Sequence, residues 1–177
     1  MARRYDPERR QRIIDAAIRI VGESGITALS HRTVAAAADV PLGSTTYHFA
    51  SLDELLVAAL RQINEGFVAA LRAIDPRPAP DLAHTLARIT GEWLAADRSR
   101  VELEYELYLA ALRRPALRPV AAEWTHGVVD HFSRGTDRAT ARALVALMDG
   151  ICLQVLLSDV PYDEAYAREM FGRVLSS

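Results

Sequence analysis

Apolar residues recur at intervals of three and four along almost the whole of this 177-residue chain. No stretch alternates convincingly with the period of two that a β-strand requires. Alanine and leucine, which favour helix, are abundant in the same segments. Half of the residues are hydrophobic and a quarter are charged, a balance typical of a globular protein with enough apolar side chains for a core. The sequence therefore predicts an all-α fold of about nine helices.

Three short helices are predicted in the first third of the chain. Asp6 is the expected N-cap of the first helix, which ends near Gly22 to Gly25. Ser30 is the expected N-cap of the second. The third covers about residues 42–49, because the proline and glycine that precede or begin it break the helical pattern. Two short helices joined by a tight turn are the arrangement of a helix-turn-helix.

A long amphipathic helix then begins after Ser51 and ends where three prolines stand in five residues, before residue 81. At 1.5 Å per residue it should extend roughly 35 Å, enough to join two domains. We therefore predict an N-terminal domain over residues 1–50, a linking helix over 51–75 and a C-terminal domain over 76–177. Further helices are expected at residues 80–96, 98–113, 116–134, 137–158 and 162–175.

The sequence gives no sign of export or membrane insertion. The N-terminus lacks the apolar core of a signal peptide, and the most apolar stretch, residues 144–157, is interrupted by polar residues and is expected to be too short to span a bilayer. We therefore expect a cytoplasmic protein with no membrane partner. Its single cysteine, Cys152, excludes an intramolecular disulfide and is read as a small buried apolar residue.

Charge is distributed unevenly, although the net charge is only −2. Any affinity for nucleic acid must therefore come from local placement of charge. Arginines are concentrated at the start of the chain, and acidic residues gather around residues 102–106. The N-terminal arginines are Arg3, Arg4, Arg9, Arg10, Arg12 and Arg19.

Residues 25–56, GITALSHRTVAAAADVPLGSTTYHFASLDELL, resemble the DNA-binding domain of the TetR (AcrR-like) family. The match is specific in order and spacing, because the capped short helix and turn are followed by Gly-Ser-Thr-Thr-Tyr-His-Phe and then by Ser-Leu-Asp-Glu-Leu-Leu. The resemblance implies a TetR-type transcriptional regulator, usually a repressor. Such a protein binds palindromic operator DNA as a dimer and is released by a small-molecule effector.

The resemblance also implies which side chains contact DNA. Backbone contacts fall to His31, Arg32 and Thr33, and base or backbone contacts to Leu42, Gly43, Ser44, Thr46, Tyr47 and His48. We expect Arg32, Ser44, Tyr47 and His48 to matter most, with the polar groups of residues 44, 46, 47 and 48 at exposed positions. Val40, Thr45 and Phe49 should instead face the core.

Two residues depart from the family pattern. Leu52 stands where a phosphate-binding lysine is common, so that contact is expected to be absent. Asp39 replaces the usual glycine of the turn and must adopt a left-handed conformation, which aspartate tolerates better than most residues. Operator affinity is then expected to depend more on the N-terminal arginines and to fall steeply with salt.

For the C-terminal domain, the resemblance implies an effector pocket and a dimer interface formed by helices 137–158 and 162–175. The first of these helices is apolar almost all round, so it needs cover on two sides. Candidate pocket residues are Trp93, Tyr105, Tyr108, Trp124, His131, Met148 and Asp149, each weighed against an ordinary place in the core or on the surface. A cationic effector is expected if Glu104 or Asp149 is buried without a partner. Glu102, Glu104 and Glu106 cannot all face inward on one helix.

Two other classes of protein remain open. An architectural DNA-binding protein would lack an effector pocket, so a closed apolar cavity would argue against it. A helical-bundle enzyme is disfavoured, because Glu123-x-x-His126 has di-iron spacing but that site needs a second copy, which the sequence lacks. Phosphate-binding loops and nucleophile elbows are also missing. We predict no enzyme activity, no catalytic residue, no metal and no cofactor.

Overall fold

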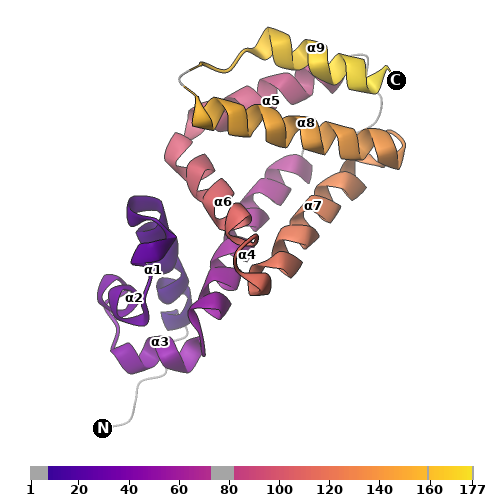
Figure 1. Cartoon of the computed structure of the whole chain (residues 1–177). Coiled ribbons are helices and arrows are strands. Elements are labelled where there is room, and N and C mark those ends of the chain that lie inside the picture. The colour runs from indigo at the N-terminus through magenta and orange to yellow at the C-terminus, as the bar shows by residue number, and fades with distance from the viewer. Residues whose placement is uncertain (1–7, 73–81, 159, 177) are drawn as a thin grey trace. The chain divides into compact units, whose positions relative to one another are not determined.

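The computed structural model describes residues 8–72, 82–158 and 160–176, and all regular structure in these ranges is helical (Figure 1). The all-α prediction is confirmed. The elements are α1 (Arg9–Ser24), η1 (Ile26–Ala28), α2 (His31–Ala37), α3 (Leu42–His48), α4 (Leu52–Arg72), α5 (Leu82–Ala96), α6 (Arg98–Ala110), η2 (Pro115–Leu117), α7 (Arg118–Phe132), α8 (Arg138–Leu157) and α9 (Glu164–Leu175).

Two compact units make up the chain. The N-terminal unit comprises Met1–Asn64 and Leu103–Ala121, and the C-terminal unit comprises Glu65–Glu102 and Ala122–Ser177. This division differs from the sequential boundary expected near residue 75. The reason is packing, since the 103–121 segment contributes side chains as deeply buried as those of α1 to the N-terminal core.

The first helix has the predicted inner face. Ile13, Ile14, Ala17 and Val21 are buried in the N-terminal core. The helix begins at Arg9, with Glu8 at the N-cap position, and the predicted cap Asp6 lies outside the described residues. Its C-cap is a glycine at φ 76°, a conformation that glycine adopts without strain.

The second helix is capped as predicted. Ser30 Oγ accepts a hydrogen bond from Thr33 N at 3.1 Å, and Thr33 Oγ1 accepts one from Ser30 N at 2.9 Å. Together these bonds form a reciprocal capping box. Asp39 has φ 52°, the left-handed conformation expected where the family pattern has glycine. The helix-turn-helix is therefore fixed locally at its entry and at its turn.

The long helix α4 also begins as predicted. Ser51 Oγ accepts a hydrogen bond from Glu54 N at 3.2 Å, while the Glu54 carboxylate accepts one from Ala50 N at 2.7 Å. Leu55, Leu56, Ala59, Leu60 and Ile63 are buried along one face. The structure describes the helix as far as Arg72, and its expected end near residue 75 lies outside the described residues.

The C-terminal unit is built on the packing of α5 against α9, with α8 alongside (Figure 1). Its core contains Leu86, Val128, Phe132, Leu144 and Phe171. α8 begins at a well-formed cap, since the carboxylate of the preceding aspartate accepts hydrogen bonds from two backbone N–H groups and one hydroxyl. These bonds, led by the hydroxyl, lower the pKa of that Asp137 carboxyl below its usual value.

α8 has a buried face and, on its other side, an apolar face that the described residues leave exposed. Ala141, Leu144, Val145 and Cys152 are buried, which confirms the reading of the cysteine. On the opposite side, Leu157 is 84% exposed. Residues 144–157 were expected to be too short to cross a bilayer, and this expectation is wrong. The helix that contains them, α8, has 20 residues and is long and apolar enough to cross a membrane by length and composition alone. Its inner face nevertheless packs on the core helices of this unit.

A tyrosine before α9 fastens this helix to α5. The Tyr162 hydroxyl donates to Ala87 O at 2.6 Å, and burial raises the pKa of the phenol well above its usual value. The ring lies directly over Gly91, where an added Cβ would stand 2.6 Å from the ring atom Cε1. The absence of a side chain at residue 91 is therefore a packing requirement.

Gly91→Ala is expected to destabilise the protein by about 1–3 kcal/mol, because the tyrosine ring must move and its hydrogen bond weakens. Gly127→Ala is the matched control, since that helical glycine has open space around an added Cβ. The control should be about 0.5–1 kcal/mol more stable than the parent through helix propensity. Thermal unfolding of the two variants checks the prediction, and equal midpoints would contradict it.

Candidate DNA-binding surface and effector region

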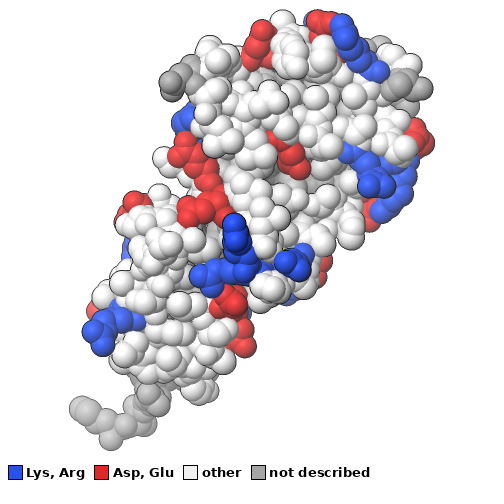
Figure 2. All heavy atoms as spheres, viewed as in Figure 1, with Lys and Arg blue, Asp and Glu red and all other residues white. Residues whose placement is uncertain are grey.

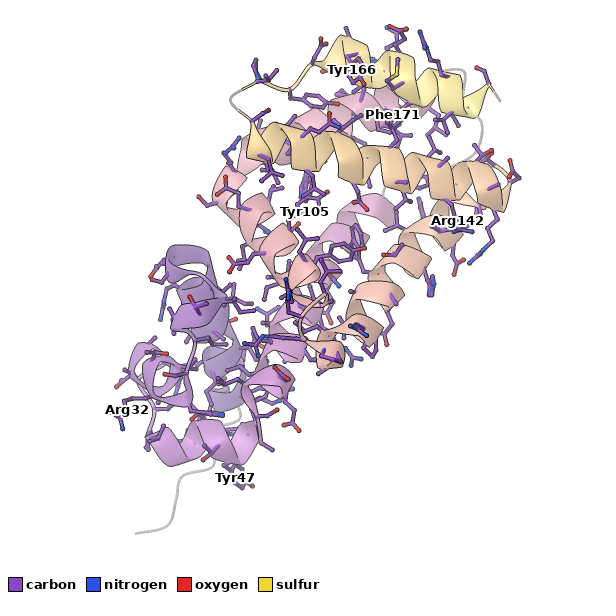
Figure 3. All side chains as sticks on the ribbon, viewed as in Figure 1. Arg32, Tyr47, Tyr105, Arg142, Tyr166 and Phe171 are labelled. Atoms are coloured by element: carbon purple, nitrogen blue, oxygen red, sulfur yellow. The ribbon has the colours of Figure 1, made fainter. Side chains whose placement is uncertain are left out.

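The third helix presents one exposed face and one buried face. Tyr47 is 81% exposed and Leu42 is 48% exposed, and Gly43 and Thr46 lie on the same open side. Figure 3 shows the Tyr47 side chain pointing away from the helices of its own unit. Thr45 and Phe49 are buried and Val40 is half-buried, as predicted. The buried face of α3 is therefore packed on its own unit and the opposite face is exposed to solvent, as a recognition helix requires.

Ser44 corrects the sequence analysis. It was expected among the exposed polar groups, but only 4% of it is exposed. It stands 100° around the helix from the fully buried Thr45, so both residues can lie within the inner half of the helix. Packing of α3 against α2 and α1 turns both residues inward.

The flanking candidates differ in how much they can reach. Arg32 on α2 is exposed and extends outward in Figure 3. Thr33 is exposed, but its hydroxyl is already used in the capping box and donates to Ala28 O at 3.1 Å. His31 and His48 are half-buried, and the His48 ring stands edge-on to Tyr47 with centroids 5.1 Å apart.

Behind the C-terminal end of α3 lies an open groove of about 330 Å³. The guanidinium of Arg10 lies 5.0 Å above the Phe49 ring, a cation–π contact at the edge of this groove. Leu52, which replaces a common lysine, is half-buried and packs on the N-terminal core. Arg10 therefore places positive charge beside the C-terminal end of α3.

The seven candidate effector residues are divided between the two units. Tyr105 and Tyr108 belong to the N-terminal unit, and the other five belong to the C-terminal unit. Tyr105 is buried and Tyr108 packs on the N-terminal core. In the other unit, Trp124 and Met148 pack on the core. Of the other three candidates in this unit, His131 is buried with its ring edge-on to Phe132, and Trp93 and Asp149 are half-buried.

An open groove of about 510 Å³ between α7 and α8 contains only one of these seven candidates, Asp149. Arg138 and Arg142 line it as well, and the first of these pairs with Asp130 at 2.6 Å. Figure 2 shows basic atoms gathered where α7 and α8 meet, and Figure 3 labels Arg142 there. The sequence analysis missed this groove, although two arginines spaced by four at the start of an apolar helix were a usable signal.

The three glutamates of α6 have separate environments. Glu102 is exposed and pairs with Arg98 at 2.9 Å, which confirms that the three do not all face inward. Glu106 accepts a hydrogen bond from Ile26 N at 2.7 Å. Glu104 and Asp149 are half-buried and both interact with neighbouring groups, so the condition set for a cationic effector is not met. Among the described residues, no three His, Cys, Asp or Glu side chains come together as a metal site.

Two family models match this chain. The model for bacterial regulatory proteins of the tetR family matches residues 13–59, and the model for the tetracyclin repressor-like C-terminal domain matches residues 77–177. The chain belongs to the TetR family of transcriptional regulators. The first match of this TetR-family chain covers the helix-turn-helix, and the second covers α5 to α9.

Solved structures agree with this membership. The multidrug binding protein EbrR in complex with ethidium is 69% identical, with a TM-score of 0.89, and the match covers 94% of this TetR-family chain and 98% of that chain. Other EbrR complexes contain imidazole, proflavin and malachite green. A TetR-family member from Streptomyces coelicolor A3 is also 69% identical, with a TM-score of 0.84 and coverage of 95% and 98%.

One relative of this chain is a transcriptional repressor. The nicotine-responsive transcriptional repressor HdnoR of Paenarthrobacter nicotinovorans is 27% identical over 161 residues, covering 83% of each protein. Regulation of transcription is thus the activity associated with the relatives of this TetR-family chain.

Proposed function

We propose that this TetR-family chain is a homodimeric repressor that binds a palindromic operator through α3 and is released by aromatic cations. The DNA-binding part of this proposal rests on the position of Tyr47. This large side chain is 81% exposed on a helix whose opposite face is packed against its own unit. The phenol of a tyrosine exposed at this place is free of packing and can donate a hydrogen bond to a phosphate oxygen of DNA. The protein would act in the cytoplasm, where its operator is.

We assign operator contacts to seven of the residues predicted from the sequence, on α2 and α3, and to one additional residue, an arginine of α1. Exposed α3 residues would face base edges and phosphates, with His48 at the helix end and the α2 residues on the DNA backbone. Ser44 is left out because it is buried. The set is His31, Arg32, Leu42, Gly43, Thr46, Tyr47, His48 and Arg10. The Thr33 hydroxyl is engaged in the capping box, so Thr33 is assigned the role of positioning α2 rather than of contacting DNA.

The dimer would form through α8 and α9. Two recognition helices must reach successive major grooves about 34–36 Å apart, and only a dimer provides both. The outer side of α8 carries small and apolar residues, with open space around an added Cβ at Gly150 and an 84% exposed Leu157. Tyr166 on α9 is 49% exposed (labelled in Figure 3). A second copy of the same face would bury this apolar surface.

The effector class follows from the 69% identical EbrR, whose complexes contain ethidium, proflavin and malachite green. These dyes share extended aromatic rings and a positive charge. In the C-terminal unit, Trp93 and Trp124 would stack on such rings and attract the positive charge through cation–π contacts. Asp149, which already interacts with neighbouring groups, stays a further candidate contact. The earlier candidates His131 and Met148 of the same unit stay in the proposal as further contacts.

Footprinting of the purified protein on the DNA that flanks its own gene is the first experiment. We expect protection of two half-sites about one helical turn apart. Protection of unrelated DNA with equal affinity would instead favour the alternative function, that of an architectural DNA-binding protein. Failure to protect any segment would contradict the repressor.

Malachite green is expected to dissociate the operator complex in a gel-shift titration. It is preferred to ethidium and proflavin, which insert between base pairs and would disturb the operator directly. Fluorescein, an aromatic anion of similar size, is the matched control and should leave the complex intact. A complex that resists malachite green while remaining specific would remove effector control by aromatic cations but would leave DNA binding in place.

A further inference from the structure

The middle of the chain reaches back to the turn that follows α1. Glu106 Oε1 accepts a hydrogen bond from Ile26 N at 2.7 Å, across 80 residues of sequence. The same oxygen lies 3.5 Å from the place of an added Cβ at Gly25, so it sits close against the turn. Ile26 begins η1, which leads directly into the capped start of α2. The carboxylate therefore holds the entry to the helix-turn-helix.

A second contact lies at the exit of the same motif. Arg114 Nη1 donates to Asp53 Oδ1 at 2.6 Å, across 61 residues of sequence, in a partly buried position. Asp53 stands in the first turn of α4, immediately after α3 and its connection. Bonds between oppositely charged groups are among the stronger polar contacts when partly shielded from water.

The segment that carries Glu106 and Arg114 is itself anchored by apolar packing in the N-terminal core. Leu107 and Leu117 are fully buried in the N-terminal core, one on α6 and the other on η2. Leu103 Cδ2 lies 3.6 Å from the place of an added Cβ at Gly22 of α1. The two polar groups thus project from a segment that is itself fixed against α1 and α4, so they can hold the motif rather than follow it.

We propose that Glu106 and Arg114 form a two-point clamp that positions the helix-turn-helix for operator binding. The inference rests on the proposed function. The two anchored residues, Ile26 and Asp53, bracket α2, the turn and α3, and neither clamp residue lies in the N-terminal third of the chain. A binding motif held at both ends loses less freedom when it docks, so the clamp raises operator affinity by pre-organisation.

Glu106→Ala is expected to weaken operator affinity about tenfold, the effect of one charge-assisted hydrogen bond. Glu106→Gln should restore part of the loss, because the amide oxygen still accepts from Ile26 N. Arg114→Ala should weaken affinity by a similar factor. Glu102→Ala is the matched control, since it removes an exposed glutamate about one turn earlier on α6 whose ion pair with Arg98 is worth little. Affinities are measured well below the unfolding midpoint, so loss of folded protein does not contribute.

Hydrogen exchange of the DNA-free full-length protein tests the clamp independently of the operator. In Glu106→Ala, amides of α2 and α3 should exchange about tenfold faster than in Glu102→Ala, while amides of α5 and α9 keep their rates. Unchanged exchange in α2 and α3 would overturn the clamp even if the protein binds DNA. Equal operator affinities of Glu106→Ala and Glu102→Ala would overturn the clamp as well. A parent protein that binds no operator would instead overturn the proposed function, and the exchange result would still decide the clamp.

Discussion

Tyr47→Ala is expected to weaken operator binding about tenfold or more without loss of stability. A hydrogen bond from the phenol to a charged phosphate is worth about 1.5–3 kcal/mol, and its removal accounts for that factor. Because 81% of the side chain is exposed in the DNA-free protein, its truncation removes little packing. Fluorescence anisotropy with the footprinted operator measures the affinity, and thermal unfolding measures the stability.

Leu112→Ala is the control for this variant. Leu112 is 72% exposed in the same unit but outside the helix-turn-helix, so its truncation should change neither operator affinity nor stability. His48→Ala should also weaken binding, by a smaller factor because His48 is half-buried. If both Tyr47→Ala and His48→Ala bound the operator like the parent, α3 would not be the recognition helix.

Gly150→Glu is expected to convert the dimer into monomers and to lower operator affinity by about two orders of magnitude or more. An added Cβ at this position meets nothing within its own chain, so the monomer accommodates the side chain. In the proposed interface, however, the carboxylate would be forced between two apolar α8 helices, where burial of an unpaired charge is strongly unfavourable. Two half-sites then act separately, and the gain of about 10²–10⁴ from bivalent binding is lost.

Sedimentation and operator titration together check this prediction. Gly127→Glu on α7 is the matched control, because it places the same carboxylate at another helical glycine with open space around it. The control should remain dimeric and bind the operator normally. A Gly150→Glu protein that stays dimeric would show that α8 is not the interface. A monomer that binds with full affinity would remove the need for a dimer.

Local features of this protein follow from short stretches of sequence. The pair Ser30 and Thr33 forms a capping box because both partners lie within one turn of helix. Asp39 adopts φ 52° because the turn between α2 and α3 requires it and because aspartate tolerates it. The helix positions were predicted to within a few residues from periodicity alone, since helical hydrogen bonds join residues four apart.

The rotation of α3 depended on contacts beyond the helix. All of its seven residues except Leu42 are small or polar, so the pattern does not define which side is inner. Packing against α2 and α1 decided that Ser44 is buried and that Tyr47 is exposed. A similar indeterminacy affected the effector residues, because an aromatic side chain on a helix satisfies a core and a pocket equally well until its neighbours are known.

By itself, the sequence determined the helical class, the helix limits, the caps and the family, because all of these are encoded in spacings of a few residues or in one contiguous motif. Only the tertiary structure placed Leu107 and Leu117 in the N-terminal core and brought Glu106 to the amide of Ile26. Those contacts join residues 60 to 80 or more positions apart, and no local periodicity specifies such a pairing. It is selected by the packing of whole helix faces, which exists only once the chain has folded.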